Sequence, residues 1–336
     1  MPKTLSIDNL HHLIDALLAE GVRVVGPKRV DNLTVYAPLA KGEEIDLAQL
    51  PRRSAKEAFF PPCETILSFE KVDGKTTVSD PDLDRLPETV LIGARPCDAA
   101  APGILDAVFS WDYDDPFYLE RRKRTTIVGV ACTHADDACF CTAVGLAPDS
   151  RAGADIFLTP LQGGGFAVEA LSAKGSTLKS RHEELLTSAG QVTPELLAAP
   201  QADPLVLEKI RTWLDANFEH PLWKEIADRC IGCGACAFLC PACHCFDIVD
   251  EGGEGSGCRR KHWDACGFGK FTMHASAHNP RDVQAQRYRN RIMHKFKYYA
   301  DKFDQTLCTG CGRCIRWCPV GIDIKAVLDE IQKKGE

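Results

Sequence analysis

Apolar residues in the first two hundred positions follow two patterns, helical spacing and short continuous runs. Leu10, Leu13, Ile14, Leu17 and Leu18 recur at helical spacing, which predicts a helix that ends near Gly21. Short apolar runs predict strands at 22–26, 33–37, 89–94, 125–131, 154–159 and 166–170, with a helix at 99–109. Strands buried on both faces read as continuous apolar runs, so this region is predicted to be an α/β domain with a mostly parallel sheet.

The remainder of the chain has a different pattern. Residues 179–229 are predicted to be mainly helical, with polar and Pro-containing joints near 191–204. A Gly-rich loop at 251–257 precedes a polar, basic helical stretch. Residues 323–334 place Val327, Leu328 and Ile331 on one face and predict a terminal helix that packs against the rest of the chain.

The cysteine content separates these two regions. Of 17 Cys, five precede residue 200 and twelve lie between Cys230 and Cys318. We therefore predict an α/β domain at 1–222 and an α-helical domain at 223–336. The chain is long, has an odd number of Cys and begins without the basic and apolar regions of a secretory signal. These features indicate reduced thiols in a cytoplasmic protein, which serve metal or redox cofactors rather than disulfides.

Charge and hydropathy exclude other classes of partner. The net charge is −7 and the isoelectric point about 5.8, so we expect no nucleic-acid partner. The longest apolar runs are far shorter than the ~20 residues of a membrane helix, so we expect no direct membrane insertion.

Two segments carry the cysteine spacing of bacterial ferredoxins that bind [4Fe–4S] clusters. CIGCGACAFLCP occupies 230–241 and CTGCGRCIRWCP occupies 308–319, both C-x2-C-x2-C-x3-C-P. In this pattern the fourth Cys ligates the other cluster. One predicted cluster is therefore held by Cys230, Cys233, Cys236 and Cys318, and the second by Cys308, Cys311, Cys314 and Cys240. Structural zinc is the alternative, but zinc pairs usually show C-x2-C twice rather than four Cys ending in Pro.

The first domain has a cysteine set of its own. Cys97 and Cys132 each follow a predicted strand, at the sheet edge where open α/β sheets place their ligands, and Cys139 and Cys141 lie in the next loop. We predict a third [4Fe–4S] cluster held by Cys97, Cys132, Cys139 and Cys141. The alternative is that some of them are buried free thiols, the role expected of Cys63.

Other residues leave their roles open. Cys243, Cys245, Cys258 and Cys266 are expected to pack or to support cluster ligands, with a further metal as the alternative. From Arg281 to Lys302 there are seven Lys or Arg and two Asp. This stretch is either a docking patch or a solvated helix face.

Several segments resemble one family along most of the chain. LIGARPCDAAAPGILDAVF, VGVACTHADDACFC, CPACHCFDI and KHWDACGFGKFT resemble the beta subunits of sulfhydrogenases and the corresponding iron–sulfur subunits of anaerobic sulfite reductases. The resemblance implies a protein that carries electrons between a flavin subunit handling NAD(P)H and a catalytic redox subunit. It also supports Cys97, Cys132, Cys139 and Cys141 as a matched set. No substrate is carried over.

The motifs favour an electron relay in a multi-subunit oxidoreductase. The chain contains no G-x-G-x-x-G and no Walker A lysine motif, so another protein is expected to supply and accept the electrons. The alternative is a self-contained reductase of a sulfur substrate, with its active site at the N-terminal cysteines. An iron–sulfur sensor that binds nucleic acid is disfavoured by the acidic isoelectric point.

Overall fold

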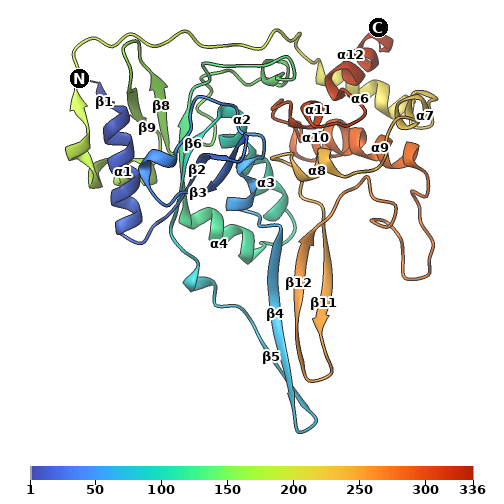
Figure 1. Cartoon of the computed structure of the whole chain (residues 1–336). Coiled ribbons are helices and arrows are strands. Elements are labelled where there is room, and N and C mark those ends of the chain that lie inside the picture. Colours follow the sequence, from blue (N-terminus) through green and yellow to red (C-terminus); the bar gives the residue numbers. More distant parts are fainter. Residues whose placement is uncertain (1, 336) are drawn as a thin grey trace. The chain divides into compact units, whose positions relative to one another are not determined.

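The computed structural model, which describes residues 2–335, forms two compact units that each combine distant segments (Figure 1). The first, here called the α/β unit, comprises residues 2–59, 87–204 and 308–313. The second, here called the helix–hairpin unit, comprises residues 60–86, 205–307 and 314–335. The predicted boundary between 222 and 223 stays a prediction about the order of domains along the chain.

An eight-stranded sheet forms the centre of the α/β unit, in the order β10-β1-β9-β8-β7-β6-β2-β3. Its strands are β1 Lys3–Leu5, β2 Arg23–Val30, β3 Leu33–Pro38, β6 Thr89–Ala94, β7 Thr125–Val130, β8 Ile156–Pro160, β9 Phe166–Ala170 and β10 Thr187–Ser188. Strands β2, β6, β7 and β8 run parallel, whereas the pairs at both ends of the sheet are antiparallel. The sheet is therefore mixed, and the prediction of a mostly parallel sheet holds only for its centre. Short β strands and hairpins at the edges cannot be told from parallel strands by apolar runs alone.

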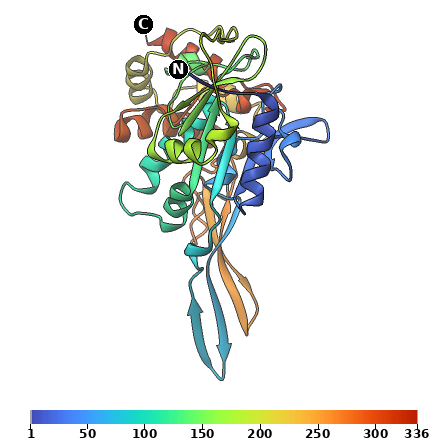
Figure 2. The same ribbon diagram turned by 90° about the vertical axis from the view of Figure 1, so that its left-hand side faces the viewer.

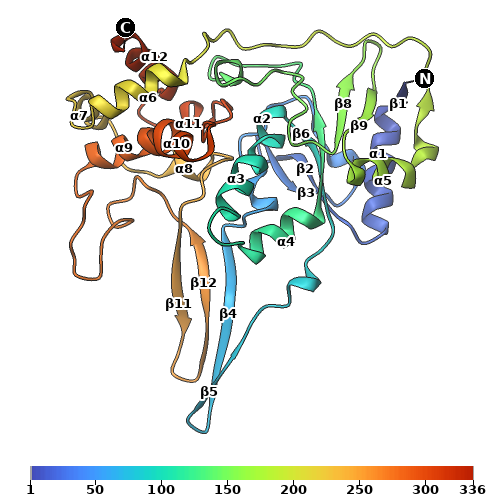
Figure 3. The ribbon, with the colours of Figure 1, turned by 180° about the vertical axis from the view of Figure 1, so that it is seen from behind.

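Helices cover both faces of this sheet. They are α1 Ile7–Ala19, α2 Pro96–Ala99, α3 Ala101–Phe109, α4 Pro116–Arg124 and α5 Ala173–Arg181, with 3-10 turns η1 Gly42–Glu44, η2 Ala55–Ala58, η4 Cys141–Val144 and η5 Glu183–Leu185. Figures 1 and 3 show α1 and α5 on one face and α3 and α4 on the other. Every residue of β6 and β7 is buried as a result, which explains their continuous apolar sequences.

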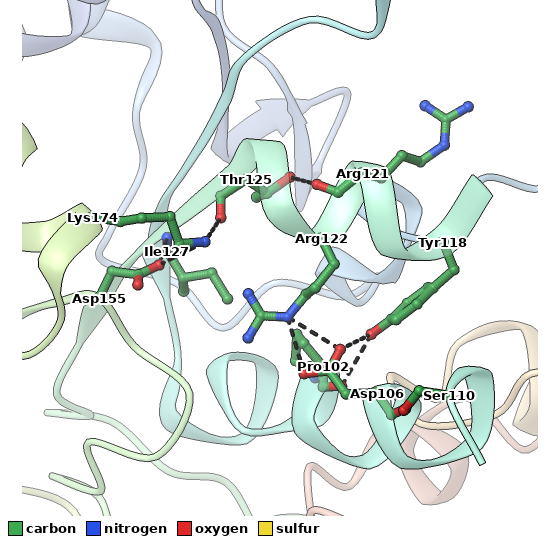
Figure 4. Close-up of polar contacts among 10 residues, drawn as sticks. All are labelled: Pro102, Asp106, Ser110, Tyr118, Arg121, Arg122, Thr125, Ile127, Asp155 and Lys174. Carbon is green, nitrogen blue, oxygen red and sulfur yellow. Dashed lines mark hydrogen bonds and ion pairs between the residues drawn. The ribbon is translucent and has the colours of Figure 1, made fainter. Parts of the chain in front are cut away.

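Polar contacts hold the helices of this unit in place (Figure 4). The Asp106 carboxylate of α3 accepts hydrogen bonds from the Tyr118 hydroxyl at 2.7 Å and from Arg122 Nε at 3.2 Å, both on α4. At the amino end of β7, Asp155 Oδ2 accepts from the Ile127 amide at 2.8 Å. Lys174 Nζ of α5 donates to the Thr125 carbonyl at 2.6 Å. These contacts leave the opposite, carboxyl end of β6 and β7 for the cysteines.

The helix–hairpin unit combines short helices with a four-stranded sheet. Its helices are α6 Leu207–Ala216, α7 Leu222–Ala227, α8 Ala235–Phe238, α9 Gln284–Met293, the π-helical turn η6 His294–Tyr298, α10 Tyr299–Phe303 and α12 Ile324–Lys334, with the 3-10 turn η3 Leu83–Arg85. Helix α11, Arg313–Arg316, begins at the last residue of the α/β unit. Among the residues described, no helix is long and apolar enough to cross a bilayer.

The sheet of this unit corrects the expectation of an all-helical second domain. Strands β4 Cys63–Val72 and β5 Lys75–Ser79 form one hairpin, and β11 Phe246–Gly252 and β12 Ser256–Trp263 form another. The hairpins pair through β12 and β4 in the antiparallel order β11-β12-β4-β5, and Figure 2 shows them extended side by side. The predicted Gly-rich loop at 251–257 is the turn of the second hairpin. Of the predicted helical region 179–229, only the segments of α5, α6 and α7 and the turn η5 are helical.

Candidate metal centres

The first ferredoxin-type motif forms a tight loop that begins at Cys230. Gly232 and Gly234 have φ angles of 67° and 74°, in the left-handed region that favours glycine. Each reverses the backbone between two cysteines, and α8 then carries the chain toward Cys240. A side-chain Cβ at Gly234 would lie 2.5 Å from the Phe268 ring, so this position is closed to larger residues.

Four cysteines from the two motifs border one cavity within the helix–hairpin unit. They are Cys230, Cys233, Cys236 and Cys318, the set that the interleaved pattern predicts for one cluster. Cys266 and Cys314 also border the cavity. Within the described chain its lining includes no carboxylate and no imidazole, so the donor set is entirely sulfur. Such a set suits soft metal centres, iron–sulfur clusters among them.

Hydrogen-bond donors reach two of these sulfurs. The Ile322 amide lies 3.2 Å from Cys318 Sγ, and Gln284 Nε2 lies 3.1 Å from Cys230 Sγ. Donors to ligand sulfur are a regular feature of cluster sites because they orient the thiolates and set the reduction potential. The cavity therefore fits a [4Fe–4S] cluster in both ligand type and surroundings. Across residues 2–335, no three Cys, His, Asp or Glu side chains are grouped as ligands of a single metal ion.

The second predicted set is divided between the two units. Cys308 and Cys311 belong to the α/β unit, whereas Cys240 and Cys314 belong to the helix–hairpin unit. Cys240 is buried, and Lys295 Nζ lies 3.3 Å from its sulfur. A hydrogen bond from the Cys243 thiol, and then the charges of Lys295 and Arg291, hold the pKa of Cys240 well below its usual value. This ligand set stays a prediction.

The N-terminal cysteines follow β6 and β7 at the carboxyl end of the sheet. Cys97 lies in α2 directly after β6, and Cys132 follows β7. Burial, together with the Asp98 carboxylate, raises the pKa of Cys97 well above its usual value. Burial raises the pKa of Cys132 to about 11, and Cys139 and Cys141 are among its electrostatic neighbours. Because a buried thiolate needs a compensating positive charge, this sulfur-rich pocket of the unit suits a metal centre.

The loop of the second ferredoxin motif packs against these cysteines inside the α/β unit. A Cβ at Gly310 would lie 2.5 Å from Cys141 Cα, and one at Gly312 would lie 2.2 Å from the Ala138 carbonyl oxygen. The Phe140 amide donates to the Gly310 carbonyl at 2.9 Å. Glycine is therefore required at both positions by close backbone approach as well as by φ angles of 62° and 73°.

A buried ion pair fastens the same loop. Arg313 donates from Nη1 and Nη2 to the two oxygens of Asp98 at 2.8 and 2.7 Å, and from Nε to the Pro51 carbonyl at 3.1 Å. Asp98 directly follows Cys97. Burial and the Asp98 charge raise the pKa of the Tyr36 hydroxyl well above its usual value, and that hydroxyl donates to Asp98 at 3.1 Å. Sequence reasoning missed this pair, because nothing local to Asp98 or Arg313 indicates the other.

Two expectations for residues outside the ligand sets need correction. Cys63, expected to be a buried free thiol, is exposed on β4, since both hairpins extend into solvent. The basic stretch 281–302 is neither wholly a docking patch nor a solvated face, because Arg289, Arg291 and Lys295 are buried.

The remaining thiols lie in the helix–hairpin unit. Cys243 and Cys266 are buried, and Cys245 lies within hydrogen-bond reach of Cys266. Cys258 is partly buried on β12.

Comparisons with known proteins agree with the cysteine pattern. Residues 229–322 match the 4Fe-4S dicluster domain family, so the C-terminal region carries a dicluster domain. The chain is 30% identical over 328 residues to sulfhydrogenase 2 subunit beta of Pyrococcus furiosus, with 94% of each chain covered. No solved structure matches the chain.

Proposed function

This chain belongs to the family of sulfhydrogenase beta subunits, and from that premise we propose that it is the iron–sulfur electron-transfer subunit of a multi-subunit oxidoreductase. It relays single electrons between a subunit that handles NAD(P)H through a flavin and a catalytic subunit of the hydrogenase or sulfite and sulfur reductase type. The cofactors are the clusters of the dicluster domain, which accept and release one electron each. The chain's residues hold, orient and insulate them.

One observation carries this proposal: four thiols from two distant motifs line a single cavity that has sulfur donors only. Cys230, Cys233 and Cys236 would hold one cluster together with Cys318. The second cluster would be held by Cys308, Cys311, Cys314 and Cys240, as the interleaved spacing of the motifs requires. Apolar Pro319, Ile322 and Ile324 also line the cavity and limit access of water to it.

Exposure of the first motif supports exchange of electrons with another protein. Cys233 is exposed, and Ile231 beside it leaves 67% of its surface open to solvent. An exposed apolar side chain at the edge of a redox site is suited to a small protein contact, the kind that transient electron-transfer complexes use. The proposed point of exchange with a partner subunit is therefore the loop 230–234.

Cys97, Cys132, Cys139 and Cys141 are proposed to hold a third [4Fe–4S] cluster. The electrostatic proximity of Cys132 to Cys139 and Cys141 supports this set, as does the burial of Cys97 and Cys132. We predict about 12 Fe per chain in anaerobically isolated protein, against about 8 for two clusters. Replacing Cys97 with Ala should lower iron by about a third, whereas Cys63→Ala, an exposed thiol outside every set, should leave it unchanged. Iron that stays constant in the Cys97→Ala protein would remove the third cluster.

Isolation of the native complex tests the relay itself. Affinity purification of the full chain from its own cells under anaerobic conditions should recover a flavin-containing subunit and a catalytic redox subunit. The reconstituted chain alone should take up electrons from a reductant without turning over hydrogen or a sulfur substrate. Unaided reduction of a sulfur substrate by the chain alone would instead establish the self-contained reductase.

A further inference from the structure

One face of helix α9 points toward the cysteines of the cavity. Gln284, Arg287, Tyr288 and Arg291 recur at i, i+3, i+4 and i+7, the spacing of one helical face, and all four line the cavity. Three of the four carry hydrogen-bond donors on long side chains. A helix face that meets a sulfur-lined cavity with donors and cations, and with no carboxylate among its four residues, is suited to an anionic occupant.

Arg291 is a buried cation without a carboxylate partner. Only 4% of its surface is exposed. Arg291 Nη2 donates to the Cys236 carbonyl at 2.9 Å, and Nη1 lies 3.7 Å from Cys243 Sγ. In the part of the chain that the structure describes, no Asp or Glu forms an ion pair with it. Because a buried charge is costly unless an opposite charge compensates it, Arg291 requires negative charge on the sulfur side.

Lys295, one turn further along in η6, repeats the arrangement beside another sulfur. Its residue is 2% exposed, and Nζ lies 3.3 Å from Cys240 Sγ and 2.7 Å from the Leu307 carbonyl oxygen. Cys240 is the cysteine that the interleaved pattern assigns to the second cluster. The same helical segment thus presents one cation to each proposed ligand set.

Gln284 supplies the third contact. Its Nε2 lies 3.1 Å from Cys230 Sγ, while its Oε1 accepts a hydrogen bond from Arg287 Nε at 2.9 Å. Arg287 in turn donates from Nη1 to the Arg281 carbonyl at 2.8 Å. Since the guanidinium occupies the amide oxygen, the amide nitrogen is the group that faces the sulfur. Gln284 is therefore fixed as a donor.

We propose that Gln284, Arg291 and Lys295 tune the reduction potentials of the two clusters, Gln284 and Arg291 for the cluster at Cys230 and Cys236, and Lys295 for the cluster at Cys240. The proposal rests on the ligand sets of the proposed function. A reduced cluster carries one more negative charge than the oxidised cluster, so a buried cation or a donor to sulfur stabilises the reduced form. These residues raise both potentials and make the chain a better electron acceptor.

The test is a potentiometric titration of the reconstituted full chain, with each cluster followed by electron paramagnetic resonance. Arg291→Gln should lower the midpoint potential of the first cluster, and Lys295→Met that of the second. We expect at least a tenfold fall in the ratio of reduced to oxidised cluster at a fixed potential, about 59 mV for one electron. Gln284→Glu should lower the first potential as well, because it replaces a donor with an anion. Arg291→Lys and Lys295→Arg should retain most of the wild-type value.

Lys297→Met is the matched control. Lys297 lies on the same turn as Lys295, but its Nζ pairs with Asp215 at 3.0 Å and with Asp301 at 2.5 Å. This variant should leave both potentials unchanged.

The outcomes separate the two proposals. A wild-type chain without clusters contradicts the proposed function. Two intact clusters whose potentials do not move in Arg291→Gln, Lys295→Met and Gln284→Glu overturn the tuning role alone. Loss of iron in Arg291→Gln, with unchanged potentials in Gln284→Glu and Lys295→Met, would show that the face supports the fold and would also overturn tuning.

Discussion

At the scale of single residues, the pair Arg313–Asp98 is the most demanding contact in the α/β unit. The two side chains are 3% and 0% exposed. A buried ion pair is stable only while both partners and their hydrogen bonds are present, since either charge alone is left in a medium of low polarity. Asp98 adjoins Cys97 and Arg313 lies between Cys311 and Cys314, so the pair fixes two cysteine-bearing segments together.

Breaking this pair should cost more than removing it. We expect Asp98→Asn or Arg313→Met to lower the free energy of unfolding by about 3–5 kcal/mol, because one buried charge stays uncompensated. The double variant Asp98→Leu with Arg313→Leu should lose less than either single variant. Anaerobic thermal unfolding followed by circular dichroism measures the difference. Glu43→Gln, which breaks the exposed pair with Lys41, should leave the unfolding midpoint unchanged. Equal losses at the buried and exposed pairs would contradict the account.

At the scale of elements, the loop 308–313 illustrates what a motif can and cannot predict. Its spacing predicts a cluster-binding loop, and Gly310 and Gly312 are expected to let it curl. The spacing does not indicate which surface the loop packs on. In the structure the two glycines lie against the backbone of 138–141, next to the N-terminal cysteines.

Substitution at these glycines should therefore disturb metal binding rather than only local flexibility. Gly312→Ala places a Cβ 2.2 Å from the Ala138 carbonyl oxygen at a φ of 73°, so the loop must shift away. We expect iron content to fall and the unfolding temperature to decrease. Gly103→Ala is the control, because Gly103 lies within α3 and its added Cβ meets nothing within 4 Å. That change should be neutral or stabilising by about 0.5–1 kcal/mol. Full iron in Gly312→Ala would show that the close approach is not required.

Helices and strands with a buried face were predictable from the sequence. Helix α1 and strands β6 and β7 lie where apolar periodicity places them, because their pattern records contact with the core. The hairpins β4–β5 and β11–β12 were missed, since most of their residues are exposed and no buried face imposes a clear alternation. Burial of Arg291 and Lys295 was missed for another reason. A cation on a helix normally indicates solvent, and only the sulfurs of a distant segment reverse that expectation.

At the scale of the whole molecule, motif spacing predicted the cysteine set of one cavity across almost 90 positions. Cys230 and Cys318 line the same cavity although they belong to different motifs. This was predictable because the ferredoxin pattern encodes an exchange of the fourth ligand. The contact between the second motif and the N-terminal cysteines was not predictable in this way, because it depends on the α/β fold that presents Cys97 and Cys141.

The central claim is that two [4Fe–4S] clusters sit on interleaved cysteines of the dicluster domain. Its most direct test is metal and acid-labile sulfide analysis of the anaerobically purified chain, with electron paramagnetic resonance after reduction by dithionite. We predict iron and sulfide in equal amounts, at least about 8 per chain, with the signals of two reduced clusters. Cys318→Ser should selectively perturb the cluster at Cys230, and Cys63→Ser should perturb neither. A colourless protein that contains zinc and gives no signal would contradict the account.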